Sequence, residues 1–326
     1  MQYRTDRYGN PISQLGFGCM RFAKKGAAID YDKAARQVLL AMERGVNYFD
    51  TAYIYPGSEE CLGRILQENG VRDRVNVATK LPQYVMRSQK AIDKTFREEL
   101  QRLRTDHIDY YLMHMFTDYA QWENLKALGI EDWIAARKAE GSVRQIGFSY
   151  HGGTDAFLQI LNAYDWDFCQ IQYNYLDEHS QAGRAGLEAA QAKGIPVIIM
   201  EPLRGGKLVR LSQEAREELS NSGTGYSAAE LGLRWLWDQS GVTCVLSGMN
   251  SEAMVEENCR VADAARPGCL TEADRALVGR IRAILRAGEK VGCTGCRYCM
   301  PCPQGVDIPA IFHYCKWIIK RTPEPR

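Results

Sequence analysis

Eight short apolar segments alternate with stretches of helical periodicity between residues 12 and 263. We expect the apolar segments to be strands, and they span residues 12–18, 46–50, 76–80, 108–114, 144–149, 168–173, 196–200 and 242–247. Between them apolar residues recur at intervals of three and four, as Ala34, Val38 and Met42 do, which is typical of a helix that buries one face. Eight such units in succession predict an α/β fold, a parallel (β/α)8 TIM barrel.

A doubly wound sheet is the competing architecture, and it normally carries a G-x-G-x-x-G loop after its first strand. The corresponding stretch, residues 16–21, reads Gly-Phe-Gly-Cys-Met-Arg and lacks the third glycine, so the sequence favours the barrel. The chain before it reads as an N-terminal β-hairpin with a turn at residues 8–11, which we expect to cover the bottom of the barrel. Residues 1–268 are expected to form the barrel, and residues 269–326 a small C-terminal extension of helices and clustered cysteines.

The charge balance argues against two classes of partner. Among 326 residues, 41 Lys and Arg nearly cancel 40 Asp and Glu, so the overall field favours neither nucleic acid nor a membrane surface. Residues 1–7 lack the apolar core of a signal peptide, and no apolar run approaches the roughly 20 residues of a membrane-spanning helix. We therefore expect a cytoplasmic protein that acts on a small molecule.

Polar residues stand at the ends of successive predicted strands, where a barrel gathers them at one mouth. Asp50, Lys80 and His114 end the second, third and fourth strands, and Tyr55 follows the second. A tyrosine hydroxyl has an ordinary pKa near ~10, and a neighbouring ammonium lowers that pKa by stabilising the phenolate. A carboxylate holds the ammonium in place, and a neutral histidine orients a carbonyl group. These four residue types predict protonation of an oxygen atom while another group delivers hydride.

At these residues the sequence resembles the aldo-keto reductase family. The matching motifs are Asp50-Thr51-Ala52-x-x-Tyr55, then Lys80 at a strand end, then residues 109–114 ending in His114. The resemblance extends from about residue 12 to residue 260. It implies that Tyr55 is the general acid in reduction, that Lys80 and Asp50 tune it, and that His114 orients the substrate.

The same resemblance implies a site for a nicotinamide dinucleotide, NADP(H) or NAD(H), bound without a Rossmann fold. It places the nicotinamide against Ser149, Gln170 and Met200. It assigns the pyrophosphate to the loop that follows, through Glu201, Pro202, Leu203, Gly205 and Lys207. It assigns the adenosine end to Gly248, Asn250, Ser251, Glu257 and Asn258.

The sequence departs from the family pattern at two places. Tyr150 and His151 follow Ser149, where many members have Asn. Gly248 and Met254 stand where many NADPH-specific members carry the Lys and Arg that grip the 2′-phosphate. The missing cations weaken the expectation of NADPH specificity and favour acceptance of NADH, with Arg260 as a candidate to compensate.

Four of the 11 cysteines are clustered near the C-terminus, at Cys293, Cys296, Cys299 and Cys302. The first three repeat the C-x2-C-x2-C spacing of bacterial-type ferredoxins, and Cys-Pro closes the run. This spacing favours one [4Fe–4S] cluster, completed by Cys302 or else by Cys315. Zinc is the alternative metal, although it usually takes paired knuckles with a longer gap. The segment resembles the ferredoxin-type C-terminal segment of a subgroup of aldo-keto reductases, and a bracing role is favoured over electron relay.

The sequence as a whole predicts an NAD(P)H-dependent oxidoreductase that reduces an aldehyde or ketone to an alcohol, or the reverse, with Tyr55 as general acid or base. A nicotinamide-binding redox sensor and an electron-transfer protein with an external partner are the alternatives. Aromatic and apolar residues after Lys80 and His114 are expected to wall the substrate pocket. They are Tyr84, Met86, Phe116, Tyr119 and Trp122.

Overall fold

Eight parallel strands close into a barrel, which confirms the predicted architecture. The structure is a computed structural model that describes residues 1–288, 300 and 302–312. The barrel strands are hydrogen-bonded in the order β3, β6, β7, β8, β9, β10, β11 and β12, with β12 returning to β3. They span Leu15–Gly18, Tyr48–Asp50, Asn76–Leu81, Ile108–Phe116, Val143–Tyr150, Phe168–Gln172, Val197–Met200 and Val242–Ser247. All eight expected strands are present, with bounds shifted by a few residues.

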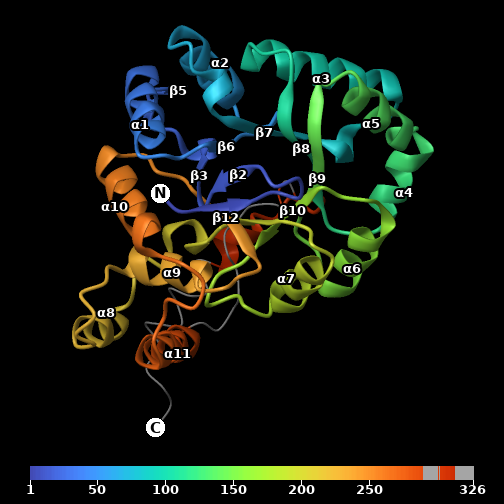
Figure 1. The fold of residues 1–326 in the computed structure, drawn as a ribbon. Helices are drawn as coiled ribbons and strands as arrows, with labels where there is room; N and C mark the ends of the chain where they lie inside the picture. The colour runs from blue at the N-terminus through green and yellow to red at the C-terminus, as the bar shows by residue number, and fades with distance from the viewer. Residues whose placement is uncertain (289–299, 301, 313–326) are drawn as a thin grey trace.

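Helices surround the barrel (Figure 1). They are α1 Tyr31–Glu43, α2 Ser58–Glu68, α3 Gln89–Leu103, α4 Ala120–Ala127, α5 Ile130–Ala139, α6 Thr154–Ala163, α7 Gly183–Ala192, α8 Gln213–Ser220, α9 Ala228–Trp237 and α10 Glu252–Ala264. Two helices, α4 and α5, follow β8, because Gly129 adopts a φ of 78° between them. The sequence also gave no sign of a small hairpin after β3, formed by β4 (Lys24–Lys25) and β5 (Ala28–Ile29).

The side chains inside the barrel are apolar in its lower layers and polar at one end. The buried interior cluster consists of Ile12, Tyr48, Ala78, Tyr110, Leu112, Phe168, Ile198, Cys244 and Leu246. Side chains two residues apart on a strand point to the same face. Asp50 therefore follows Tyr48 inward, and Lys80 follows Ala78, so both rise above the apolar interior at the carboxyl ends of their strands.

The N-terminal hairpin covers the opposite end of the barrel, as expected. Strands β1 (Tyr3–Thr5) and β2 (Pro11–Ser13) pair antiparallel. The Asp6 carboxylate accepts hydrogen bonds from Tyr110, at 3.1 Å, and from Gln145, near the starts of β8 and β9. Arg4 donates to the carbonyls of Trp237 and Gln239 at the end of α9. The hairpin thus closes the amino ends of the strands and leaves the carboxyl ends uncovered.

Helix α11 (Glu272–Ala287) follows α10 and starts in a capping box made by Thr271 and Asp274. Its later turns contact the loop after β10: Arg282 pairs with Glu178 at 2.7 Å, and Arg286 donates to the Leu176 carbonyl at 3.1 Å. Because that loop lies at the carboxyl ends of the strands, α11 ends on the same side of the barrel as Lys80.

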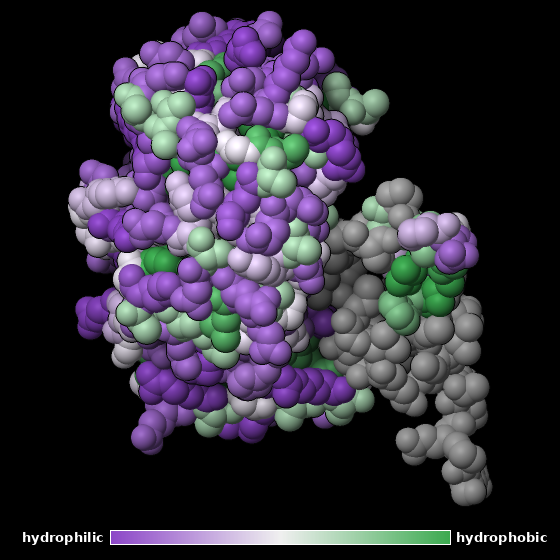
Figure 2. Space-filling model, turned by 90° about the vertical axis from the view of Figure 1, so that its right-hand side faces the viewer, coloured by the Kyte–Doolittle hydropathy of each residue, from purple (hydrophilic) through white to green (hydrophobic). Residues whose placement is uncertain are grey.

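Residues 308–312 are helical, and Asp307 caps this segment by accepting a hydrogen bond from the Ala310 N–H at 3.1 Å. Cys302 belongs to the described residues, whereas Cys293, Cys296, Cys299 and Cys315 lie outside them. The face in Figure 2 is mostly hydrophilic, with hydrophobic residues scattered over the barrel surface. Within the described ranges, no helix has the length and apolarity needed to span a bilayer.

Candidate active site

A buried ion pair stands at the centre of the barrel mouth. The Lys80 side chain is 1% exposed, and its Nζ donates to Asp50 Oδ1 at 2.6 Å, Asp50 Oδ2 at 2.7 Å and the Thr51 carbonyl at 2.6 Å. Three oxygen atoms thus surround the three N–H groups of the ammonium. Burial raises the pKa of Asp50, and the Lys80 charge opposes that rise. The Thr51 carbonyl was not identified from the sequence, since no residue type marks a backbone acceptor.

Tyr55 and His114 complete the expected group of four. Lys80 Nζ lies 5.3 Å from the centroid of the Tyr55 ring. The rings of Tyr55 and His114 meet edge to face, with centroids 6.1 Å apart and an interplanar angle of 83°. Asp50, Lys80 and His114 are buried, whereas Tyr55 is partly exposed. The structure therefore brings all four residues together and leaves the tyrosine within reach of a substrate.

His114 is held as a neutral imidazole. It is 2% exposed, and burial lowers its pKa well below 6.5, helped by the charges of Lys80 and His151. Its Nδ1 finds no hydrogen-bond partner among the residues that the structure describes. Burial also lowers the pKa of His151 to about 4, while a hydrogen bond with Gln181 opposes that shift. A neutral imidazole with an unused nitrogen suits the expected role of orienting an oxygen atom.

A second polar network supports the outer side of the site. Thr79 donates to Glu59 at 2.6 Å, and Arg102 pairs with the same carboxylate at 3.1 Å. Tyr111 donates to Glu99 at 2.6 Å, and burial raises the pKa of Glu99 well above its ordinary value. This network joins α2 and α3 to β7 and β8, the strands that carry Lys80 and His114. Its members were not identified from the sequence, because they lie on the helix-facing side of the strands.

The two residues expected to hold a nicotinamide carboxamide are neighbours in the sheet. Ser149 and Gln170 are paired in the register of β9 and β10. Ser149 Oγ accepts the Met115 N–H at 2.8 Å, where β8 bulges and Met115 has a φ of 62°. Gln170 is 2% exposed, and its Nε2 lies 3.7 Å from the Met200 sulfur.

The Gln170 side chain carries a buried acceptor that a nicotinamide carboxamide could satisfy. Its Oε1 is buried and has no hydrogen-bond partner among the described residues. An unpaired buried acceptor costs free energy, and a carboxamide NH2 group would satisfy it. Ser149, Gln170 and Met200 therefore fit the carboxamide and ring of a nicotinamide.

The loop after β11 is tightly wound and rich in charge. Glu201 and Arg204 have φ values of 52° and 51°, and Gly205 and Gly206 continue the left-handed run. Arg204 is buried and pairs with Asp177 at 3.0 Å. Burial raises the pKa of Glu201, with Asp177 adding to the rise and Arg21, Arg204 and Lys207 opposing it. Leu203 packs against Gly232 of α9, so its side chain serves the fold.

The residues expected at the adenosine end already make contacts within the protein. Asn258 donates to Ser247 at 3.0 Å, Glu257 accepts from Ser227 at 2.6 Å, and Ser251 caps α10. Asn250 is exposed.

Arg260, the candidate for the missing cation, pairs with Glu230 at 2.8 Å, which ties its guanidinium to α9.

Three of the expected pocket residues, Met86, Phe116 and Trp122, belong to the core instead. Phe116 and Trp122 are fully buried, and Trp122 packs against Trp166 with ring centroids 4.8 Å apart. The prediction that Phe116 and Trp122 wall the pocket was wrong. Phe116 ends β8 beyond the bulge at Met115, Trp122 lies on α4, and both rings pack in the hydrophobic core. Tyr119 lies on the start of α4, where its hydroxyl donates to Glu123 at 2.7 Å.

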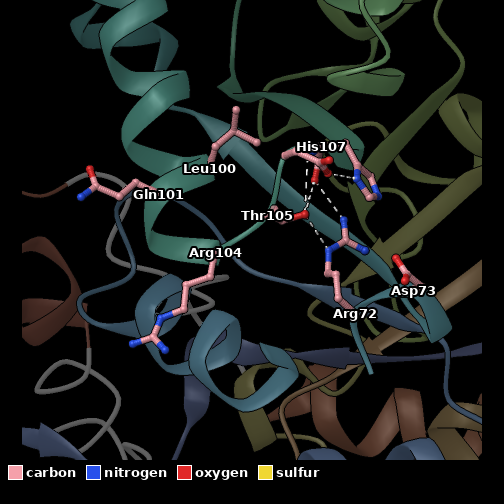
Figure 3. A pocket seen from close by; sticks show the side chains of 8 residues that line it. Arg72, Asp73, Leu100, Gln101, Arg104, Thr105 and His107 are labelled. Atoms are coloured by element: carbon pink, nitrogen blue, oxygen red, sulfur yellow. Dashed lines mark hydrogen bonds and ion pairs between the residues drawn. The ribbon is translucent and has the colours of Figure 1, made fainter. Parts of the chain in front are cut away.

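The cavity of about 570 Å³ in Figure 3 lies away from this site. Its lining comes from the segments before β7 and β8, at the amino ends of the strands. Arg72 there donates to Thr105 Oγ1 at 3.1 Å and to the His107 carbonyl at 3.0 Å. These contacts hold the bottom of the barrel together.

Comparison with known proteins identifies the family. The model of the aldo/keto reductase family matches residues 14–266. The chain therefore belongs to the aldo/keto reductase family of oxidoreductases.

Individual relatives are distant. The chain is 29% identical over 225 residues to the uncharacterized oxidoreductase YrpG of Bacillus subtilis, covering 62% of this chain and 66% of that protein. It is 27% identical over 271 residues to L-galactose dehydrogenase of Arabidopsis thaliana, covering 77% of this chain and 84% of that protein. The chain thus spans slightly less than two thirds of the length of YrpG.

Solved structures share the fold. Aldo-keto reductase AKR11C1 from Bacillus halodurans, in its holo form, matches with a TM-score of 0.71 and 26% identity, covering 86% of this chain and 96% of that one. An aldo-keto reductase from Klebsiella pneumoniae in complex with NADPH matches with a TM-score of 0.68 and 23% identity, over the same shares of the two chains.

The depressed pKa of His114 predicts how stability depends on pH. Below about pH 6.5, His114 binds a proton in the unfolded chain but not in the folded protein. The free energy of unfolding therefore falls with the pH, by about 1.4 kcal/mol per pH unit. His114→Gln removes this dependence. We expect the free energy of unfolding of the wild type, relative to this variant, to fall by about 2 kcal/mol between pH 6.5 and 5.

Urea unfolding of both proteins at several pH values measures that difference. The exposed His179 provides a matched control through His179→Gln. A difference between wild type and His114→Gln that stays constant with pH would show that His114 is not held neutral.

Proposed function

We propose that this protein reduces an aldehyde or ketone to an alcohol, or catalyses the reverse reaction, with a nicotinamide dinucleotide and with Tyr55 as general acid or base. The observation that carries the proposal is the buried Lys80 ammonium, fixed by Asp50 and Thr51 and placed 5.3 Å from the Tyr55 ring. A positive charge at this position stabilises a phenolate, which is the form that Tyr55 takes after it gives up its proton.

Each residue has a defined part in the reaction. When bound, the nicotinamide supplies a hydride to the carbonyl carbon or accepts one from the alcohol. Tyr55 gives its hydroxyl proton to the oxygen that becomes the alcohol, and in the reverse direction it takes that proton back. Lys80 holds its charge beside the phenolate, and Asp50 keeps the ammonium in place. His114, neutral and with Nδ1 unpaired among the described residues, orients the substrate oxygen.

The proposed cofactor is NADP(H) or NAD(H). Gln170 and Ser149 would hold the carboxamide, and Met200 would cover the ring. Glu201, Pro202, Leu203, Gly205 and Lys207 form the proposed pyrophosphate loop, and Gly248, Asn250, Ser251, Glu257 and Asn258 the proposed adenosine end. The Klebsiella pneumoniae relative was solved with NADPH, whereas this chain has Gly248 and Met254 in place of a cationic clamp. The proposal therefore includes acceptance of NADH.

Tyr55→Phe removes the proton donor and keeps the ring. We expect turnover of carbonyl substrates to fall by at least ~10³-fold, because a positioned general acid accelerates proton transfer by about this factor over unassisted protonation. The Kd for NADPH or NADH, measured by fluorescence titration, should stay within about 2-fold of the wild type.

Tyr53→Phe is the matched control, since Tyr53 lies two residues away and donates instead to Glu98 at 2.7 Å. It should retain turnover. If Tyr55→Phe is as active as Tyr53→Phe, the catalytic assignment is incorrect.

We also propose a division of the chain and a metal site. Residues 1–268 form the catalytic barrel, and residues 269–326 form an extension in which Cys293, Cys296, Cys299 and Cys302 bind a [4Fe–4S] cluster that braces the extension. The C-x2-C-x2-C spacing supports iron–sulfur over zinc, and Cys315 is the alternative fourth ligand.

The same spacing supports a second candidate function, in which the cluster serves a redox sensor or passes electrons to a partner protein. The proposed location is cytoplasmic.

Cys296→Ser tests the bracing role. We expect this variant, purified without oxygen, to lose iron and acid-labile sulfide and to have a lower Tm, while kcat changes little in the protein that remains folded. Cys269→Ser, just before α11, is the control and should keep the metal.

Normal folding with loss of turnover in Cys296→Ser would instead support electron relay. Reduction of the cluster by NADPH, followed by electron paramagnetic resonance, would support the same conclusion. Zinc in place of iron would exclude the cluster.

A further inference from the structure

His151 continues strand β9 into the barrel mouth. It follows Tyr150, the last residue of β9, and its N–H donates to the Phe116 carbonyl at 2.8 Å, which extends the ladder to β8. The Tyr150 ring packs edge to face against Phe157 of α6, with centroids 5.2 Å apart, so Tyr150 faces the helices. Because side chains alternate along a strand, Ser149 and His151 face the barrel axis instead. His151 therefore lies above Ser149 at the carboxyl end of the barrel.

A bulge in β8 keeps Phe116 out of the same space. Leu112 belongs to the interior cluster, so His114 faces inward, and Phe116 would follow it in a regular strand. The register shifts before Phe116, where Met115 adopts a φ of 62°. This extra residue turns Phe116 outward, and its ring packs against Phe148 with centroids 6.1 Å apart. The bulge thus removes an aromatic ring from the mouth beside His114.

His151 and His114 are neighbours at the ends of adjacent strands. The charge of His151 is among those that lower the pKa of His114, which agrees with the short separation that the two strands impose. Both rings are neutral, since burial lowers the pKa of His114 well below 6.5 and that of His151 to about 4. A carboxylate on a substrate therefore gains little from these two rings, because neither carries a charge.

Gln181 sets the orientation of the His151 ring. It lies in the loop after β10, and its Oε1 is 3.2 Å from His151 Nδ1. The loop is fixed at this point, since the Gln181 carbonyl accepts a hydrogen bond from Thr154 Oγ1 at 2.8 Å. An amide oxygen only accepts hydrogen bonds, so Nδ1 carries the proton of the neutral ring and Nε2 is an acceptor. An acceptor of this kind recognises a hydroxyl group.

We propose that His151 binds a hydroxyl group on the carbon next to the substrate carbonyl, so that the protein prefers hydroxylated aldehydes and ketones to plain or acidic ones. This assignment rests on the proposed carbonyl reduction. Tyr55 and His114 hold the carbonyl oxygen, and His151, from the strand beside that of His114, accepts the hydroxyl proton in a hydrogen bond. The His151 ring stays neutral and takes no part in proton transfer to the carbonyl oxygen.

Three two-carbon aldehydes test this preference, because they differ in one substituent. Glycolaldehyde has a hydroxyl on the carbon next to the carbonyl, acetaldehyde has a hydrogen there, and glyoxylate has a carboxylate in place of the methyl group. We would measure kcat and KM for each aldehyde in the wild type and in His151→Leu, His151→Gln and Gln181→Leu. His179→Leu is the matched control, since His179 is an exposed histidine of the loop that carries Gln181. The Kd for NADPH and the Tm show whether each variant is folded and binds the cofactor.

We expect the wild type to have a higher kcat/KM for glycolaldehyde than for acetaldehyde or glyoxylate. His151→Leu should lower kcat/KM for glycolaldehyde by ~10- to 100-fold, because the hydroxyl loses its partner, and should leave that for acetaldehyde within about 2-fold of the wild type. His151→Gln should recover part of the loss, because its amide oxygen can accept the same hydrogen bond. Gln181→Leu should show a smaller loss of the same selectivity, and His179→Leu should match the wild type.

An equal loss for glycolaldehyde and acetaldehyde in His151→Leu would overturn the proposal, because it would assign His151 a structural role. An unchanged kcat/KM for glycolaldehyde in that variant would overturn it too, as would a wild type that prefers acetaldehyde or glyoxylate. If His151→Leu does not fold, the selective loss must appear in Gln181→Leu, and its absence there would overturn the proposal. A wild-type protein that reduces none of these aldehydes with NADPH or NADH would overturn the proposed function itself.

Discussion

The proposed active site depends on an ammonium group buried inside the barrel. Taking such a charge out of water costs several kcal/mol, and the cost is recovered only when its partners are well placed. Lys80 meets this condition through both oxygens of Asp50 and the Thr51 carbonyl. A buried pair of this kind is weak support for stability, since well-packed apolar residues often serve a fold equally well. Its placement 5.3 Å from the Tyr55 ring agrees with the proposed role in proton transfer.

The parallel barrel explains how residues from distant segments reach one mouth. Asp50, Lys80 and His114 lie on three adjacent strands, and Ser149 and Gln170 lie on the next two. Charges at the other end of the barrel have a different role, since Asp109 there accepts the Val77 N–H at 2.8 Å and pairs with Arg72 and Arg144. The carboxyl ends of the strands thus hold the proposed chemistry, and the amino ends hold the barrel closed.

The features that could be predicted from the sequence are those that depend on local periodicity and on the residues at strand ends. The eight strands follow from short apolar runs, and the group around Tyr55 follows from polar residues where those runs stop. Contacts between distant loops could not be predicted in this way. The burial of Phe116 and Trp122, for example, depends on how α4 packs against the barrel. The ligands of the cysteine segment remain a proposal from spacing.

A comparison of Lys80→Met, Asp50→Leu and the double variant tests the central claim, that the pair serves proton transfer more than stability. Each single change leaves a buried group without its partner and should lower the free energy of unfolding by ~3–5 kcal/mol. The double variant should recover most of that loss, because no charge remains buried, yet turnover should stay abolished in all three. A double variant that is stable and still turns over carbonyl substrates would contradict the account.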